Sequence, residues 1–238
     1  MMTVVGLSVA VVLSVSMNAE AQRKKKDKEP ELAICKRGKL IFEDDFSGKE
    51  LDWIPSRDGK QRGEWKIVRK TLMTESGGPD YLHIYRPFGR VCDAVFDLRV
   101  LAPKGVSVHI LACEGGGSSA PTGIIATNSQ TMFLRYVVGK EEYVNWGTKP
   151  LPYVKPRWLT VCYEMIGNRV ALTVDGRTIT YEAPTLEAGK VRSLDRLAIS
   201  VSGKTSGEAF AIDDVKVHEA LPKDEGEDKD EKGKKKKK

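Results

Sequence analysis

The chain has 238 residues, of which 40% are hydrophobic and 30% are charged, and its formal net charge is +6. This composition is too apolar for a wholly disordered protein, and the length excludes several large domains. Much of the basic character lies at the ends, since residues 222–238 alone carry eight basic and six acidic side chains.

An apolar stretch from Val4 to Met17, followed by the small residues around Ala19 and Ala21, is typical of a cleavable secretory signal covering residues 1–21. A membrane anchor is the alternative, but about 14 apolar residues fall short of the roughly 20 that a spanning helix needs. We therefore expect a secreted or periplasmic protein with no transmembrane segment after cleavage.

Composition divides the rest of the chain into three parts. Residues 22–38 are predicted to be a charged linker, 39–221 a single folded domain, and 222–238 a Lys-rich disordered tail. Such a tail can hold an anionic cell-surface polymer through point charges and counterion release, or it can simply add solubility. Nothing in the sequence predicts specific recognition of a nucleic acid.

Between residues 39 and 221 the apolar pattern has a period of two, which predicts β-strands and very little helix. Two-residue turns are expected at Gly167-Asn168 and Asp175-Gly176. Long irregular connections are expected at 114–122 and 140–155. About ten to thirteen antiparallel strands in one domain predict an all-β, two-sheet jelly-roll sandwich with disordered charged termini. The predicted strands are 40–46, 64–68, 81–86, 90–101, 106–112, 131–138, 158–165, 169–174, 197–201 and 210–217.

Four widely spaced cysteines favour a structural role over a zinc site, which needs close pairs. In an oxidising compartment Cys35, Cys92, Cys113 and Cys162 could form up to two disulfides, with three connectivities open. Alternation along the strand places Cys92 on the inward face, either bonded or as a buried thiol.

Several motifs, in this order along the chain, resemble the concanavalin A-like (laminin G or glucanase type) jelly-roll superfamily of secreted bacterial proteins. They are Phe42-Glu43-Asp44-Asp45-Phe46, Gly63-Glu64-Trp65-Lys66-Ile67-Val68, Phe96-Asp97-Leu98-Arg99-Val100, the hairpin from Arg157 to Gly176, and Ala211-Ile212-Asp213-Asp214-Val215. The resemblance implies a lectin-like fold. One similar branch contains exported domains related to 3-keto-disaccharide hydrolases, although two segments typical of that branch differ here.

The sequence shows no residue spacing that is typical of a catalytic site of this fold. The Glu-x-Asp-x-x-Glu spacing of glycosidases of this fold does not occur, and Asp93 and Asp97 are interpreted as solvated residues of an outer strand face. His83, His109 and His218 are too widely separated to predict a zinc site, and His109 is expected at the surface or rim. We predict no catalytic residue.

The superfamily often holds calcium between its first and last strands, and hard oxygen ligands suit that ion. Asp44, Asp45, Asp213 and Asp214 lie in the corresponding segments, so they are the candidate ligands of a structural Ca²⁺. The alternative is that Asp213 and Asp214 accept backbone hydrogen bonds at a turn. No other cofactor is expected.

The loop predicted at 140–155 combines aromatic, amide and hydroxyl groups. Tyr143, Asn145, Trp146 and Tyr153 are the candidate carbohydrate-binding residues, because rings stack on sugar C–H faces and amides bind sugar hydroxyls. Trp146 could instead fold back to cap the core.

We therefore expect an exported, non-catalytic β-sandwich that binds carbohydrate or another surface polymer. Two alternatives remain open: a glycoside or 3-keto-glycoside hydrolase, and a structural or adhesion module attached through its basic tail.

Overall fold

The computed structural model describes residues 29–48, 50–55, 64–74, 82–103, 105–114, 120–126, 131–138, 142–151, 157–182, 194–203 and 209–223. The predicted signal, residues 22–28 of the predicted linker, residues 224–238 of the predicted tail, and Tyr153 lie outside the described residues. Within those ranges, no helix is long and apolar enough to cross a membrane.

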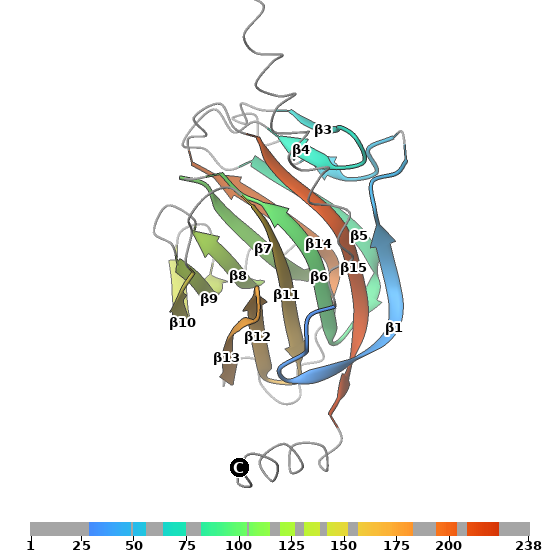
Figure 1. Cartoon of the computed structure of the whole chain (residues 1–238). Helices are drawn as coiled ribbons and strands as arrows, with labels where there is room; N and C mark the ends of the chain where they lie inside the picture. Colours follow the sequence, from blue (N-terminus) through green and yellow to red (C-terminus); the bar gives the residue numbers. More distant parts are fainter. Residues whose placement is uncertain are drawn as a thin grey trace, which may run out of the picture.

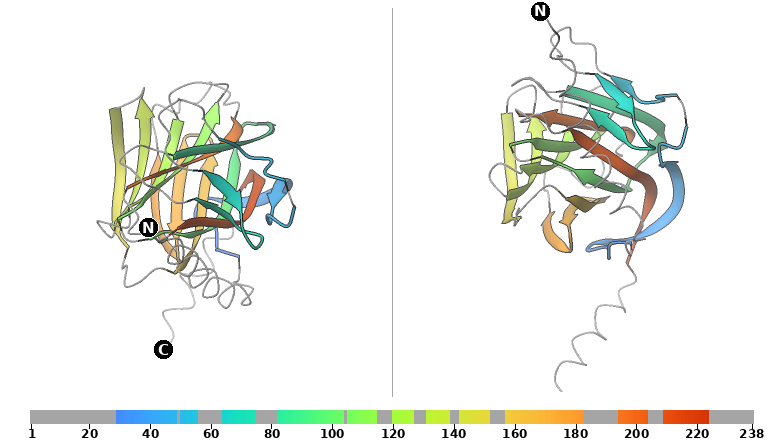
Figure 2. Two further views of the ribbon diagram at one scale, coloured as in Figure 1. Left: turned by 90° about the horizontal axis from the view of Figure 1, so that it is seen from above. Right: turned by 45° about the horizontal axis from the view of Figure 1, so that its top comes forward.

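Two antiparallel sheets pack face to face and confirm the predicted all-β sandwich (Figures 1 and 2). Sheet A has the order β13(Arg177–Glu182), β12(Arg169–Val174), β11(Trp158–Ile166), β6(Ala94–Leu101), β15(Phe210–Pro222), β4(Leu72–Thr74), β3(Trp65–Ile67), and β1(Cys35–Asp44) also pairs with β15. Sheet B has the order β10(Glu142–Pro150), β9(Thr131–Val138), β8(Ala120–Ala126), β7(Ser107–Glu114), β14(Leu194–Ser202), β5(Leu82–Val91), β2(Ile54–Pro55).

The core between the sheets follows directly from the period-two pattern. Sheet A contributes Phe96, Leu98 and Val100 of β6, and sheet B contributes Val108 and Ile110 of β7, all at most 2% exposed. Successive side chains of a strand point to opposite faces, so the residues between these have to lie on the outer faces of the sandwich. Removing apolar surface from water is the main force that holds the two layers together.

Both predicted two-residue turns are present. β11 and β12 are joined by Gly167-Asn168, and β12 and β13 by Asp175-Gly176. Asp175 and Gly176 have φ angles of +48° and +73°, the left-handed pair that matches the twist of a tight hairpin. Turn chemistry therefore sets the register of these three strands.

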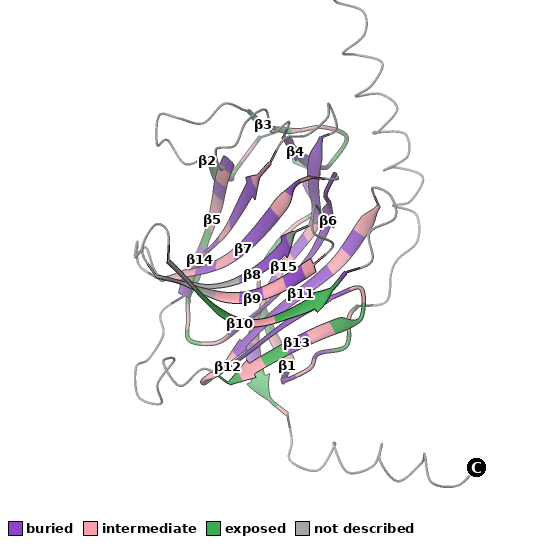
Figure 3. Cartoon of the chain, turned by 90° about the vertical axis from the view of Figure 1, so that its left-hand side faces the viewer, coloured by how far each residue is buried: buried purple, intermediate pink, exposed green. Residues whose placement is uncertain are grey.

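Both predicted long connections contain strands. β8 begins at Ala120, and β10 runs through most of the segment that was expected to be irregular. β10 is an edge strand with a bulge between Asn145 and Gly147, and Figure 3 shows it as largely exposed. An edge position tolerates Pro and Gly because one side of the strand needs no ladder hydrogen bonds.

The prediction for Cys92 is wrong. β5 continues to Val91 and β6 starts at Ala94, so Cys92 lies in the connection between them and is exposed. Alternation applies only within a continuous ladder, and the connection removes Cys92 from the inward row.

The folded part also begins earlier than predicted. β1 starts at Cys35, and residues 29–34, here called the N-terminal segment, lie against the outer face of sheet A. Leu32 and Ile34 pack with Val95 of β6, Cys162 of β11 and neighbouring apolar residues. All eight residues of β6 are buried, on both faces of the sheet: the N-terminal segment covers Val95, and Met73, Ala209 and Ala211 pack against Leu101 on the same outer face.

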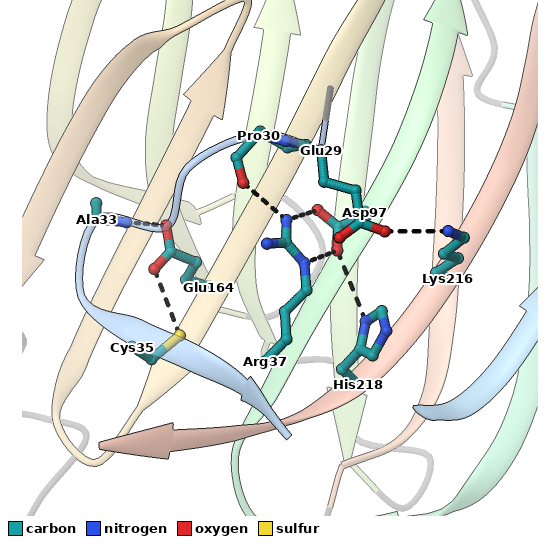
Figure 4. Close-up of polar contacts among 9 residues, drawn as sticks. All are labelled: Glu29, Pro30, Ala33, Cys35, Arg37, Asp97, Glu164, Lys216 and His218. Carbon is teal, nitrogen blue, oxygen red and sulfur yellow. Dashed lines mark hydrogen bonds and ion pairs between the residues drawn. The ribbon is translucent and has the colours of Figure 1, made fainter. Parts of the chain in front are cut away.

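A buried carboxylate holds the N-terminal segment in place (Figure 4). Glu164 of β11 is 0% exposed and accepts hydrogen bonds from the backbone N–H groups of Ala33 and Ile34, both at 2.8 Å. The thiol of Cys35 lies 3.4 Å from the same carboxylate. Hydrogen bonds of this kind offset the cost of burying a polar side chain.

Asp97 is not a solvated residue: it is 9% exposed, and Arg37 of β1 lies against its carboxylate. Its carboxylate receives a two-pronged bond from Arg37, with Nε and Nη2 at 2.8 and 2.7 Å (Figure 4). The Arg37 side chain also donates to the Pro30 carbonyl at 3.0 Å. Hydrogen bonding to Asp97 is the main cause of the raised pKa of Arg37. The ion pair fastens β1 and the N-terminal segment to β6.

Replacing Arg37 by Met should lower the free energy of unfolding by about 3 kcal/mol, because it leaves the Asp97 carboxylate buried without its main partner. Urea unfolding followed by circular dichroism measures the change.

The double variant Arg37→Met/Asp97→Leu is the control, since it removes both charges. It should recover a large part of the loss; a double variant as unstable as the sum of its singles would contradict the proposed pairing.

Candidate binding face

The outer face of sheet B brings together residues from five long strands and from the edge strand β10. Ladder register places them in rows that run across the strands, between rows that face the core. The first row is His83, Ser200, His109, Ile124, Phe133 and Thr148. The second row is Tyr85, Ala198, Leu111, Thr122, Arg135 and Asn145. A third includes Pro87, Arg196 and Cys113.

Two arginines on this face lie against aromatic rings. The guanidinium carbon of Arg135 is 4.2 Å from the centroid of Phe133, and that of Arg196 is 5.6 Å from the centroid of Tyr85. Arg196 also forms an ion pair with Asp195 at 2.9 Å. Rings and planar cations therefore lie side by side on one surface, where both can contact a ligand.

His109 is buried, not at the rim as predicted. It is 7% exposed, in the row between Ser200 and Ile124. Burial lowers the pKa of His109 to about 4, with smaller contributions from His83 and Arg135. The imidazole is therefore neutral at neutral pH, and each of its nitrogens has one hydrogen-bonding role.

Acid should destabilise the protein through His109. Between about pH 6.5 and pH 4 the unfolded chain binds a proton that the native imidazole does not, so stability falls as pH falls. His109→Gln should remove about 2 kcal/mol of the stability difference between about pH 7 and about pH 4.5, as measured by urea unfolding.

His83→Gln, which changes a half-buried imidazole in the same row, is the matched control and should keep most of the parental slope. An unchanged slope in His109→Gln would contradict the assignment.

The predicted carbohydrate-binding residues are only partly brought together. Asn145 is exposed and in register with Arg135 on the outer face of sheet B. Position 143 lies further along β10 in register with Val137, and nothing is described of its side chain. Tyr153 lies outside the described residues.

Trp146 folds back against the core, which was the alternative to a carbohydrate-binding role. It is the extra residue of the β10 bulge, half-buried against the core. Its indole stacks on Tyr181 of β13 with ring centroids 5.0 Å apart and an interplanar angle of 8°. The amine of Lys149 also donates to the Thr178 carbonyl at 3.1 Å, so these contacts join the edge of sheet B to the edge of sheet A.

Trp146→Ala should therefore lower the free energy of unfolding by about 2 kcal/mol, since it removes a stacked, half-buried ring. Val144→Ala on the same strand is the control, because Val144 is 50% exposed. Its cost should stay within about 0.5 kcal/mol in the same urea titration. Equal stability of the Trp146 variant and the parent would contradict the edge-closing role.

The four predicted calcium ligands all accept hydrogen bonds from the chain. Asp44 binds the Phe46 N–H at 2.8 Å and the indole N–H of Trp53 at 2.9 Å. Asp45, Asp213 and Asp214 accept bonds from Ser47, Asp214 and Arg99 respectively. In the part of the chain that the structure describes, no group of three or more His, Cys, Asp or Glu side chains could hold a metal ion.

All four cysteines are free, and none of the three predicted disulfide connectivities is present. Burial raises the pKa of the thiols of Cys35 and Cys162, and raises that of Cys113 to about 11. Since the thiolate is the reactive form, these three behave as small packed side chains.

Sequence reasoning missed most residues of the outer face of sheet B. His83, Tyr85, Phe133 and Arg135 all lie within or beside predicted strands, and each neighbours an inward apolar residue such as Ile84 or Leu134. Alternation was a sufficient signal to place them outward. Their meeting across five strands depends on strand order, which the pattern does not contain.

A comparison with solved structures finds chains of similar fold. A protein of unknown function with a galectin-like fold from Bacillus subtilis is 11% identical and covers 80% of this chain and 100% of its own, with a TM-score of 0.63. A laminarinase from Flavobacterium sp. UMI-01 is 15% identical, with coverages of 76% and 100% and a TM-score of 0.57. This chain has a concanavalin A-like jelly-roll fold.

A carbohydrate-binding module, CBM66 from Bacillus subtilis, is also similar to this chain. It is 10% identical, covers 73% of this chain and 96% of its own, and has a TM-score of 0.50. Scans against protein-family models and curated proteins find no match. The comparisons therefore establish the fold, and the predicted superfamily resemblance is confirmed at that level.

Proposed function

We propose that this protein binds carbohydrate without cleaving it, and that the outer face of sheet B is the binding site. The observation that carries the proposal is the pair of adjacent rows in which Phe133, Arg135 and Asn145 lie together. A sugar ring presents apolar C–H groups on its faces and hydroxyls around its rim. Aromatic rings suit the first, and guanidinium, amide and hydroxyl groups suit the second.

Rigid strands support the site. Core residues alternate with the proposed binding residues on every long strand of sheet B, so packing of one face fixes the positions of the other. Ser200, between His83 and His109, is 1% exposed, so it packs within the first row and helps to fix the positions of its neighbours.

Binding is favoured over hydrolysis by the residue types on this face. Both retaining and inverting glycosidases generally need two carboxyl groups flanking the scissile bond. The first two rows and the three named residues of the third contain no Asp or Glu. Similarity to both a carbohydrate-binding module and a laminarinase supports a carbohydrate ligand without deciding between the two activities.

Polysaccharide affinity electrophoresis followed by glycan-array binding tests the proposal. Phe133→Leu and Tyr85→Leu should each weaken binding by about tenfold, because a stacked ring is lost while an apolar side chain remains. Trp158→Leu is the control, since it removes a ring from the outer face of sheet A. Equal binding by all four proteins would refute the proposed site.

Two further outcomes separate the alternatives. Release of soluble sugar from a bound polysaccharide would favour the hydrolase. Loss of all binding on deletion of residues 224–238, with the Phe133 and Tyr85 variants unaffected, would favour attachment through the basic tail.

A further inference from the structure

We infer that the outer face of sheet B binds a sugar joined to an alkyl chain, as in a glycolipid. The sugar lies at the polar end of the second row, and the alkyl chain lies on an apolar strip at the other end. This apolar strip consists of Ile54, Tyr85, Ala198 and Leu111. The inference rests on the proposed carbohydrate-binding function and names the chemical class of its ligand.

The apolar strip extends the second row onto the edge strand β2. Ile54 of β2 is in register with Tyr85 of β5. Ala198 of β14 follows Tyr85, and Leu111 of β7 follows Ala198. Neighbouring strands lie about 4.8 Å apart, so the three steps from β2 to β7 make a narrow strip about 14 Å long. This shape matches an extended alkyl chain better than a compact ring.

Every side chain of the apolar strip reaches the surface. Ile54 is 43% exposed, and the other three residues are half-buried. In the first row, by contrast, Ser200 and His109 on β14 and β7 are buried. A ligand that covers the strip therefore removes apolar surface from water. The Tyr85 ring can pack on an alkyl chain as it can on the C–H face of a sugar.

The opposite end of the second row is polar. Asn145 of β10 lies there, and the Phe133 ring of β9 lies in the adjacent row. The Asn145 side-chain carbonyl accepts the Gly147 N–H at 3.3 Å, which orients the exposed amide. An amide hydrogen-bonds sugar hydroxyls, and a ring packs on sugar C–H faces. The sugar therefore belongs at this end and the alkyl chain at the other.

The edge strand argues against a protein as the occupant of the apolar strip. Pro55 follows Ile54 in β2 and has no N–H, so β2 is a poor template for a strand of another chain. A stable protein complex also uses about 20 to 30 residues from each partner, whereas the apolar strip has four side chains in one row. Its size suits one alkyl chain.

Ligands that share a head group and differ in alkyl length test the inference. Isothermal titration calorimetry would compare butyl, hexyl, octyl and decyl β-glucosides, and the matching β-galactosides, below their critical micelle concentrations. Tetraethylene glycol monooctyl ether supplies an octyl chain without a sugar. The full-length parent is compared with Ala198→Asp and Ile54→Ser. Leu40→Ser is the matched control, because Leu40 is 40% exposed and lies on β1 of the other sheet.

We expect the affinity of the parent to rise about twofold with each methylene, because full burial of a methylene is worth roughly fourfold and the apolar strip covers one side of the chain. Ala198→Asp, in the middle of the strip, should remove this rise from the hexyl glycoside onward. Ile54→Ser, at the far end, should lower only the affinity for the decyl glycoside, by about threefold. Leu40→Ser should match the parent. The octyl ether should bind about tenfold more weakly than the octyl glycoside.

Circular dichroism confirms folding. If Ala198→Asp does not fold, Ile54→Ser decides, since it changes an exposed side chain. A rise with alkyl length that both variants keep in full would overturn the placement of the alkyl chain on the apolar strip. Equal binding of the octyl ether and the octyl glycoside would overturn the link to a sugar.

Two outcomes separate this inference from the proposed function. Equal affinity for butyl and decyl glycosides, with polysaccharide binding that Phe133→Leu weakens, would overturn the inference and leave the proposed function in place. Absence of binding to glycosides and polysaccharides alike would overturn the proposed function itself. Dimerisation in analytical ultracentrifugation that Ile54→Ser abolishes would assign the apolar strip to a second copy of the chain and overturn the inference.

Discussion

Burial of the Glu164 carboxylate against two backbone N–H groups of the N-terminal segment makes the two outer faces of this sandwich different. Without that segment, Val95, Cys162 and their apolar neighbours on sheet A would face water. The carboxylate, together with the ion pair between Arg37 and Asp97, ties the segment and β1 to two strands of the sheet, β11 and β6. The N-terminal segment thereby covers part of the outer face of sheet A.

The outer face of sheet B has the opposite character. Its rows mix rings, cations, imidazoles and hydroxyls; Tyr85, Phe133 and Arg135 are half-buried, whereas Ser200, His109 and Ile124 in the middle of the first row are buried. Because the core fixes every second residue of the same strands, the spacing of these groups is set by the ladder. The face therefore combines a rigid frame with a chemically varied surface, as the proposed carbohydrate binding requires.

Much of the fold could be predicted from local rules. The two-residue turns at Gly167 and Asp175 and the apolar alternation were sufficient for the sandwich, since both depend on short-range sterics. The capping role of Trp146 was not decided, because a bulge shifts the alternation by one residue and nothing in the pattern marks it. The burial of Asp97 was missed for a different reason: its partner, Arg37 of β1, lies 60 residues away along the chain. The burial of His109 was missed as well, because it depends on the neighbouring strands β14 and β8, and the sequence pattern does not give the strand order.

The contacts between β10 and β13 have a consequence for the behaviour of the protein at high concentration. Terminal strands of a sheet present unpaired N–H and C=O groups that invite another chain to add on. Here the bulge, the stacked indole, Lys149 and the final Pro150 of β10 turn one such margin toward its counterpart in the opposite layer. That margin is a poor template for intermolecular β-sheet growth, so self-association is disfavoured along this side of the molecule.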